Sequence, residues 1–145
     1  MSVQDQINKY ISDQSSTKRK EMQELHQIIL NISPGCKLWF LNGRNKENKI
    51  VSNPNIGYGS QAIKYANGKT REFYRIGVST NTTGISVYFI GIKDKRYLSE
   101  TYGQKLGGAS ITGYCIKFRN KKDINIDILE EIIADHMDMG AARGL

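Results

Sequence analysis

The amino-acid sequence predicts an α+β fold, in which helices at both ends of the chain cover one face of an antiparallel sheet. Apolar residues recur at helical spacing near both termini, in residues 3–11, 21–32 and 128–137. Between these segments, short runs of aromatic and β-branched residues are separated by Gly, Asn and Thr, which is typical of strands joined by tight turns. Terminal helices packed on such a sheet form an α-β-α two-layer sandwich and leave its other face open.

Length and composition indicate a single domain spanning residues 1–145. With 39% apolar and 24% charged residues, the composition is that of a globular protein rather than a disordered or fibrous one. No apolar run approaches the ~18 residues of a membrane span, and the N-terminus lacks the features of a signal peptide. We therefore expect a cytoplasmic protein with no membrane partner. Cys36 and Cys115 have no Cys-x-x-Cys spacing and are expected to be buried free thiols.

Two amphipathic helices are predicted at the start of the chain. The first carries its apolar stripe over residues 3–11. The second has its periodic part from Glu21 onward and ends at Ser33, because Pro34 disfavours helical geometry in the residue before it. The basic run at 18–20 lies near the start of this helix, where the helix dipole disfavours cations, so a structural role does not explain it.

The middle of the chain predicts the sheet. The apolar run 36–41 is a first strand, and the polar stretch 44–55 is a loop that carries at most one short strand. Residues 56–91 hold three consecutive antiparallel strands, which we expect at the centre of the sheet. The Asn67-Gly68 pair predicts a β-hairpin with a type I′ turn between the first two, and residues 80–84 turn the chain into the third.

The last third of the chain predicts a short helix or turn over 93–102, a glycine-rich loop over 103–108, and a last strand over 111–118. Asn125 is a suitable N-cap for a final helix. The core stripe of that helix is expected to be Ile128, Leu129, Ile132, Ile133 and either His136 or Met137.

Known catalytic motifs are not met. The glycines at 57–62 match the letters of a dinucleotide fingerprint, but a hairpin follows them instead of a helix. The glycines at 103–108 are followed by Ala109, where a phosphate loop needs Lys. Neither His26 nor His136 has a second His at the spacing of a catalytic metal site, so structural roles are expected for both. No nucleophile with a base can be named, which favours a binding protein over an enzyme.

Charge and strand alternation point to the open face of the sheet. Residues 54–122 hold 12 Lys and Arg against 3 Asp and Glu, whereas residues 123–145 hold 1 against 6. Alternation predicts that Arg71, Phe73, Arg75, Tyr88, Cys115, Lys117 and Arg119 share one face. A basic, aromatic face suits a small anionic ligand or an acidic protein, although it is also what an ordinary solvated sheet presents. The candidate ligand-binding residues are Lys64, Tyr65, Arg75, Tyr88 and Lys117.

Two other partners stay open. Rings interleaved with cations are also what single-stranded nucleic-acid binders use, so a nucleic acid is a second possible ligand. Four carboxylates recur at helical spacing on one face of the last helix, where they form either a site for hard cations or the solvated side of the helix. These are Asp127, Glu131, Asp135 and Asp138. Otherwise no cofactor is expected, and both a monomer and a homodimer are compatible with the sequence.

The order and spacing of several segments resemble the YdhG-like family of small bacterial domains of unknown function. The matching segments are 54–60, 65–69, 114–117 and 123–133, and the two opening helices with Pro34-Gly35 agree in position. The resemblance implies an α-β-α sandwich of the frataxin-like sort. One branch of the family is linked to intracellular iron delivery, so the resemblance also implies iron as the cation for the four carboxylates.

The chain departs from the family in two places. Thr112-Gly113 stands where a glycine-lysine pair usually opens the last strand, and the loop from Gly103 is slightly longer. The basic run at 18–20 lies in the region where frataxins carry an acidic first helix. The resemblance therefore supports the fold more than the function. Our prediction from the sequence is a non-catalytic binding domain with a basic, aromatic sheet face.

Overall fold

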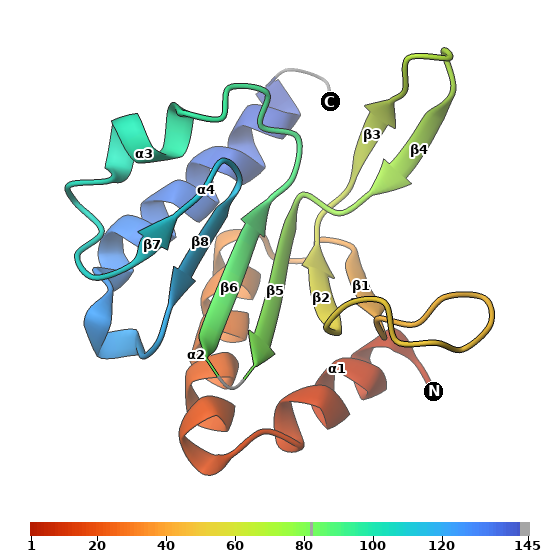
Figure 1. Cartoon of the computed structure of the whole chain (residues 1–145), viewed down its shortest axis with the longest axis horizontal. Helices are drawn as coiled ribbons and strands as arrows, with labels where there is room; N and C mark the ends of the chain where they lie inside the picture. Colours follow the sequence, from red (N-terminus) through yellow and green to blue (C-terminus); the bar gives the residue numbers. More distant parts are fainter. Residues whose placement is uncertain (82, 143–145) are drawn as a thin grey trace.

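The chain folds into an antiparallel sheet with helices at both ends, which is the predicted α+β sandwich (Figure 1). The computed structural model describes residues 1–81 and 83–142, with side chains as far as residue 137. Within these residues, none of the helices is both long and apolar enough to cross a membrane. In chain order the elements are α1 (Val3–Ser12), α2 (Ser16–Ile32), β1 (Leu38–Leu41), β2 (Asn55–Tyr58), β3 (Gln61–Lys64), β4 (Thr70–Phe73), β5 (Ile76–Asn81), β6 (Gly84–Phe89), α3 (Tyr97–Tyr102), β7 (Ser110–Ile111), β8 (Cys115–Phe118), the 3-10 turn η1 (Lys121–Asp123) and α4 (Ile126–Ala142).

The two N-terminal helices form where they are predicted. Helix α1 begins with a capping box, in which the side chains of Ser2 and Asp5 each accept from the other's backbone N–H. Helix α2 begins at Ser16, ahead of its periodic part, and ends directly before Ser33. Each helix buries one apolar stripe, and together these stripes consist of Ile7, Ile11, Met22, Leu25 and Ile29.

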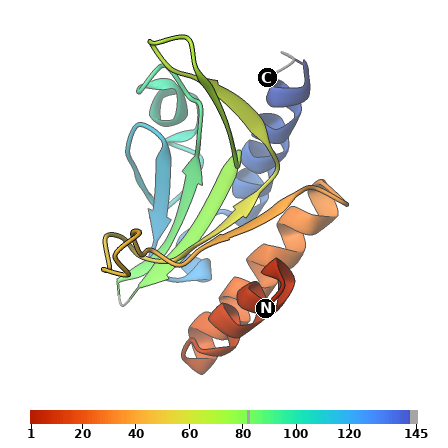
Figure 2. The same ribbon diagram turned by 90° about the vertical axis from the view of Figure 1, so that its right-hand side faces the viewer.

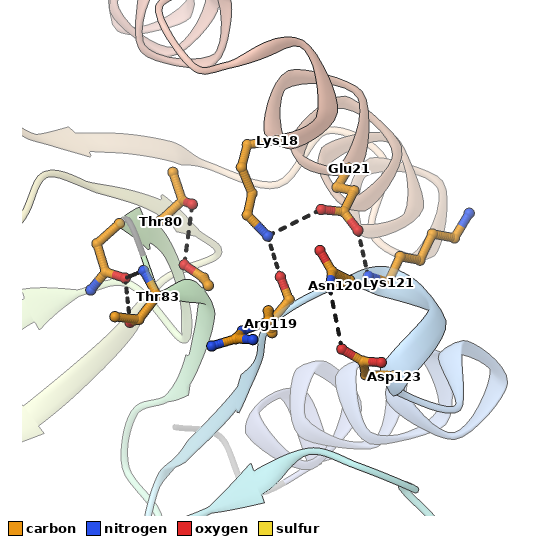
Figure 3. A network of polar contacts seen from close by, with 10 residues as sticks. Lys18, Glu21, Thr80, Thr83, Arg119, Asn120, Lys121 and Asp123 are labelled. Atoms are coloured by element: carbon orange, nitrogen blue, oxygen red, sulfur yellow. Dashed lines mark hydrogen bonds and ion pairs between the residues drawn. The ribbon is translucent and has the colours of Figure 1, made fainter.

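Lys18 in the basic run has a structural role, contrary to the sequence-based expectation. Its Nζ donates to Glu21 of the same helix at 3.2 Å and to the backbone oxygen of Arg119, just after β8 (Figure 3). The Glu21 carboxylate also accepts from the backbone N–H of Lys121. The Lys18 side chain is only 17% exposed. It therefore ties the start of α2 to the segment that leaves the sheet.

Strands β2, β5 and β6 lie at the centre of the sheet. The sequence predicts three consecutive strands there, with the Asn67-Gly68 hairpin between the first two. Instead, that hairpin consists of β3 and β4, which form a separate sheet, so the central strands β2 and β5 are not consecutive in the chain. Among the described residues the strand order is β1-β2-β5-β6-β8-β7, and every neighbouring pair is antiparallel. Val78 of β5 pairs with Ile56 of β2 and with Val87 of β6, and all three side chains are buried in the core. Because directly opposite residues share a face, this row marks the side that the helices cover.

The reverse side of the sheet carries no helix among the described residues. Figure 2 shows α1, α2 and α4 together on one side of the sheet. On the other side lie Gly57, Gly77 and Tyr88, which are directly opposite one another on β2, β5 and β6. We call the side that carries these three residues the open face.

Strands β3 and β4 form a separate two-stranded ribbon, which we call the arm. It projects away from the six-stranded sheet (Figure 1). The hairpin is predicted correctly, but its type I′ turn is not. The N–H of Gly68 donates to Tyr65 O, and the N–H of Tyr65 donates to Lys69 O. Among the residues of this loop, only Gly68 has a positive φ, of 83°. This is a three-residue loop that ends in a left-handed glycine, instead of a two-residue turn with two left-handed residues.

The predicted last strand over 111–118 is in fact a hairpin. The chain turns after β7 and pairs back as β8, with the Thr112 N–H donating to Cys115 O at 2.9 Å. Because of this turn, the Tyr114 side chain does not lie on the same face as Ile116. The centroid of its ring lies 6.1 Å from that of Tyr88. Tyr114 is 52% exposed, whereas Ile116 is fully buried.

The final helix α4 forms as predicted. The Asn125 side chain accepts from the backbone N–H of Ile128 and caps the helix. The residues buried against the sheet are Leu129, Ile132, Ile133 and Met137. His136 is partly buried, and its Nε2 lies 3.0 Å from Ile90 O.

Candidate functional site

Five aromatic rings gather on the open face, and we call them the ring cluster. Phe73 and Tyr74 lie closest, with centroids 4.1 Å apart and planes inclined by 32°. Trp39 stands edge-on to both, at 6.0 and 6.5 Å. Tyr88 and Tyr114 form a second pair at 6.1 Å. These residues come from β1, the end of β4, β6 and the β7–β8 turn, so the cluster crosses most of the sheet.

Two facing glycines make room for the middle of the cluster. Gly57 and Gly77 are directly opposite each other on β2 and β5. A Cβ on Gly57 would lie 2.4 Å from Tyr74 Cδ2, and a Cβ on Gly77 would lie 2.7 Å from Tyr74 Cε1. Both distances are too short for any side chain, so the Tyr74 ring lies directly on the backbone of the two strands.

The hydroxyls of Tyr74 and Tyr88 stay protonated. Burial, together with the neighbouring Tyr88 and Tyr114, raises the pKa of Tyr74 to about 12. Burial likewise raises the pKa of Tyr88. A protonated hydroxyl donates a hydrogen bond, so these groups suit an acceptor such as a phosphate or carboxylate oxygen.

Cations border the cluster at both ends. Lys37 Nζ lies 4.4 Å from the Trp39 ring centroid, and the Arg71 guanidinium lies 4.8 Å from that of Phe73, both within cation–π range. At the other end, Lys117 of β8 pairs with Ser86 and so shares the open face with Tyr88. A Cβ on Gly113, next to Tyr114, would lie 3.4 Å from the side chain of Lys95, which places this lysine against the β7–β8 turn.

Carboxylates are absent from the strands of the six-stranded sheet. Glu72, on β4 of the arm, is paired with Lys37. The exposed carboxylates Asp127, Glu131 and Asp135 instead lie on α4, in the helix layer. Negative charge is therefore concentrated on α4 and not on the strands that carry the open face.

Arg75 does not share a face with Lys117, contrary to prediction. Its Cδ lies 3.3 Å from where a Cβ on Gly59 would be, beside Met137 of α4, and the residue is only 8% exposed. Burial lowers the pKa of the Arg75 guanidinium. The cause is the bend between β4 and β5. It interrupts the alternation by one residue, so that Tyr74 takes the open face and Arg75 the side facing α4.

The other candidate residues divide between two places. Tyr88 and Lys117 lie together on the open face, as predicted. Lys64 and Tyr65 lie at the end of the arm, where both are exposed and neither joins the ring cluster. Arg71 and Phe73 do lie at the cluster, as alternation predicts.

Three members of the ring cluster were not predicted to lie on the open face, namely Trp39, Tyr74 and Tyr114. One signal for Tyr74 is present in the sequence. Glycine inside a strand marks a close approach, and both Gly57 and Gly77 are such glycines. No comparable signal exists for Tyr114, because its position depends on the turn between β7 and β8.

The histidines have structural partners, as predicted. His26 Nδ1 lies 2.6 Å from the hydroxyl of buried Tyr58, and His136 packs edge-on against Phe89. Burial lowers the pKa of both imidazoles. Cys36 and Cys115 are free, partly buried thiols whose pKa burial raises. Because its pKa is raised, neither thiol is poised as a thiolate nucleophile.

The predicted carboxylate row is only partly described. Asp127, Glu131 and Asp135 are all exposed on α4, and Asp135 accepts a hydrogen bond from Tyr102 at 2.8 Å. The side chain of Asp138 lies outside the described residues. In the described part of the chain, no three His, Cys, Asp or Glu side chains come together as a metal-binding group, and this includes Asp127, Glu131 and Asp135.

An open cleft of about 770 Å³ lies between the start of α2 and the segment 120–126. Lys20 and Lys122 line it together with Glu21 and Glu24. Both carboxylates already bind partners. Glu24 pairs with the side chain of Lys121. Glu21 accepts from the backbone N–H of the same residue, as Figure 3 shows. The cleft is thus the seam where the helix layer meets the end of the sheet.

Comparison with known proteins adds no relative. No protein-family model, curated protein or solved structure matches the chain. The function of the chain therefore has to be inferred from its own geometry and chemistry.

Proposed function

We propose that this protein is a non-catalytic binding protein, and that its open face takes a small anionic ligand that carries a flat ring. The observation that supports this most is the ring cluster with Arg71 and Lys37 at one end and Lys117 at the other. Flat ligand groups stack on aromatic side chains, and the cations attract the negative group. Of the sequence-based candidates, the proposal keeps Tyr88 and Lys117.

A mononucleotide is the simplest probe of this proposal, because it joins a flat ring to a phosphate. Trp39 is the only tryptophan in the chain and belongs to the ring cluster, so its fluorescence reports binding at the site itself. We expect adenosine monophosphate to change this fluorescence saturably and to raise the melting temperature. Adenosine and inorganic phosphate, which each lack one of the two groups, should bind more weakly.

Tyr114 and Tyr65 give a matched pair of variants, since both are exposed tyrosines in hairpin turns. Tyr114→Ala should weaken mononucleotide binding about tenfold or more, because a ring stacked on a base contributes about 1–3 kcal/mol. Tyr65→Ala, on the arm, should leave affinity unchanged. If Tyr65→Ala has the larger effect, the site lies on the arm. If no ring-bearing anion alters the Trp39 fluorescence, the proposal is wrong.

An iron-delivery role, implied by the resemblance to the YdhG-like family, stays a prediction, as do the family assignment and a cytoplasmic location. The exposed Asp127, Glu131 and Asp135 have the oxygen ligands that hard cations prefer. Anaerobic titration with ferrous iron should show saturable binding, weakened by Glu131→Gln, if this role is correct. Linear, unsaturable uptake would end it.

A further inference from the structure

We infer that the ligand of the open face is single-stranded nucleic acid, which crosses the sheet along the ring cluster. This rests on the proposed function and narrows it, from any ring-bearing anion to a polymer of them. Three features carry the inference: the length of the cluster, the distribution of the cations, and the exposure of the rings.

The ring cluster is longer than one nucleotide. It runs from Trp39 on β1 to Tyr114, directly before β8, across the strand order β1-β2-β5-β6-β8. Neighbouring strands are about 4.8 Å apart, so these four steps cover roughly 19 Å. Successive stacked bases advance about 3.4 Å along a strand. A single nucleotide occupies a small part of this row, whereas a segment of about five stacked nucleotides spans it.

The cations are spread over the whole row instead of converging on one point. Arg71 lies at the Trp39 end, together with Lys37 in its ion pair with Glu72, and Lys95 and Lys117 lie at the Tyr114 end. A mononucleotide has one phosphate group and can use only one of these ends. A nucleic acid has a phosphate at every step, and so it can contact both ends at once.

The arm extends the same charge beyond the sheet. Lys64, Lys69 and Arg71 are all exposed on it, and none forms an ion pair with a carboxylate in the described part of the chain. Arg71 lies at the point where the arm meets the ring cluster, since it covers the ring of Phe73. A strand that leaves the cluster at this end therefore continues along a basic surface.

The rings favour single strands over duplexes. Tyr114 is half-exposed, and Trp39, Phe73 and Tyr88 are partly exposed, so their surfaces can reach a base. Bases in a duplex stack on one another and present only their edges, whereas unpaired bases offer their faces to aromatic side chains. A carboxylate-rich protein partner would use the cations but not the rings.

The test is a length series measured through Trp39 fluorescence. Thymidine monophosphate, oligothymidylates of four and twelve nucleotides, and a twelve-base-pair duplex are titrated at several salt concentrations. Affinity should rise steeply from the monomer to the oligomers. For the twelve-nucleotide strand, the logarithm of the affinity should fall with the logarithm of the salt concentration with a slope of about −3. Each of four contacted phosphates contributes about −0.7 to this slope. The duplex should bind more weakly than the single strand.

Two substitutions locate the effect. Lys117→Gln should make the salt slope shallower by about 0.7, the contribution of one phosphate contact. Lys122→Gln, an exposed lysine in the cleft beside α2, is the charge-matched control and should leave the slope unchanged. Equal slopes for both variants and the parent protein would overturn the placement of the strand on the open face.

The remaining outcomes distinguish the nucleic-acid inference from the small-ligand proposal on which it rests. If the monomer binds as tightly as the twelve-nucleotide strand, the polymer inference is wrong and the small-ligand proposal stands. If the duplex binds as tightly as the single strand, stacking on the rings is not the mode of binding and the inference is wrong. If neither monomer nor oligomer alters the Trp39 fluorescence, both fail.

Discussion

Two glycines and one tyrosine decide the shape of the open face at the level of single residues. The Tyr74 ring lies flat against the backbone at Gly57 and Gly77, and no side chain fits beneath it. The ring in turn packs on Phe73 and Trp39, so its position fixes theirs. The surface proposed to bind the ligand therefore depends on the absence of two side chains as much as on the presence of five rings.

Gly77→Ala should lower the free energy of unfolding by about 1–3 kcal/mol, because the added methyl overlaps the Tyr74 ring. The loss should be much smaller in a Tyr74→Ala background, where the ring is absent. Gly113→Ala is the control, since its Cβ meets Lys95 at an ordinary 3.4 Å. Urea denaturation measures all four variants. Equal losses with and without the Tyr74 ring would contradict this packing.

The two partly buried histidines should make the protein less stable in mild acid. Burial lowers the pKa of His26 and of His136 below the usual 6.5, so below pH 6.5 the unfolded chain binds more protons than the folded chain. Stability is therefore fully present above about pH 6.5, falls as the pH drops below this value, and levels off below the folded-state pKa.

Urea denaturation at about pH 7.5 and about pH 5.5 checks this dependence. The free energy of unfolding should be lower at pH 5.5, and a His26→Gln, His136→Gln double variant should show a smaller difference between the two. Glu24 and Glu72 contribute little to this difference, because their ion pairs with Lys121 and Lys37 lower the pKa of each from 4.5, well below the range compared. A parent protein equally stable at both values would show that these imidazoles are not held neutral by burial.

At the level of elements, the helices and strands that pack on the core can be predicted from the sequence, whereas the local bends between strands cannot. Helices α1, α2 and α4 and the central strands follow from apolar periodicity, because burying one side of an element requires it. The bend between β4 and β5 leaves no trace in the alternation of residues 70–79, so Arg75 was assigned to the wrong face. The turn that splits residues 111–118 into β7 and β8 is hidden in the same way, since Tyr114 fits the apolar alternation of one long strand.

The junction between α2 and the end of β8 can be tested by comparing two lysines of the basic run at 18–20. Lys18→Ala should cost about 1–2 kcal/mol of unfolding free energy, because it removes a charged donor to Glu21 and to the Arg119 backbone. Lys20→Ala changes an exposed neighbour in the cleft and should cost little. Equal effects of the two substitutions, measured by thermal unfolding, would show that Lys18 does not join these elements.

At the scale of the whole molecule, charge is separated between the two layers. The chain carries a net charge of +7, yet residues 123–145, most of which form α4, hold 6 acidic side chains and 1 basic one. The excess of cations therefore lies in the rest of the chain, including the strands and the arm. If the ligand is an anion, as proposed, such a distribution turns the sheet side of the molecule toward it before any stacking occurs.

The most direct test of this account is to map the ligand by NMR, following the backbone amides and the Trp39 indole N–H, which donates to Gly59 O at 2.8 Å. On titration with a short oligothymidylate at low salt, we expect the largest shift changes at Trp39, Gly77, Tyr88 and Lys117, and little change on α4. Changes centred on α4 or on the cleft beside α2, with the Trp39 indole signal unmoved, would contradict the claim that the open face is the binding surface.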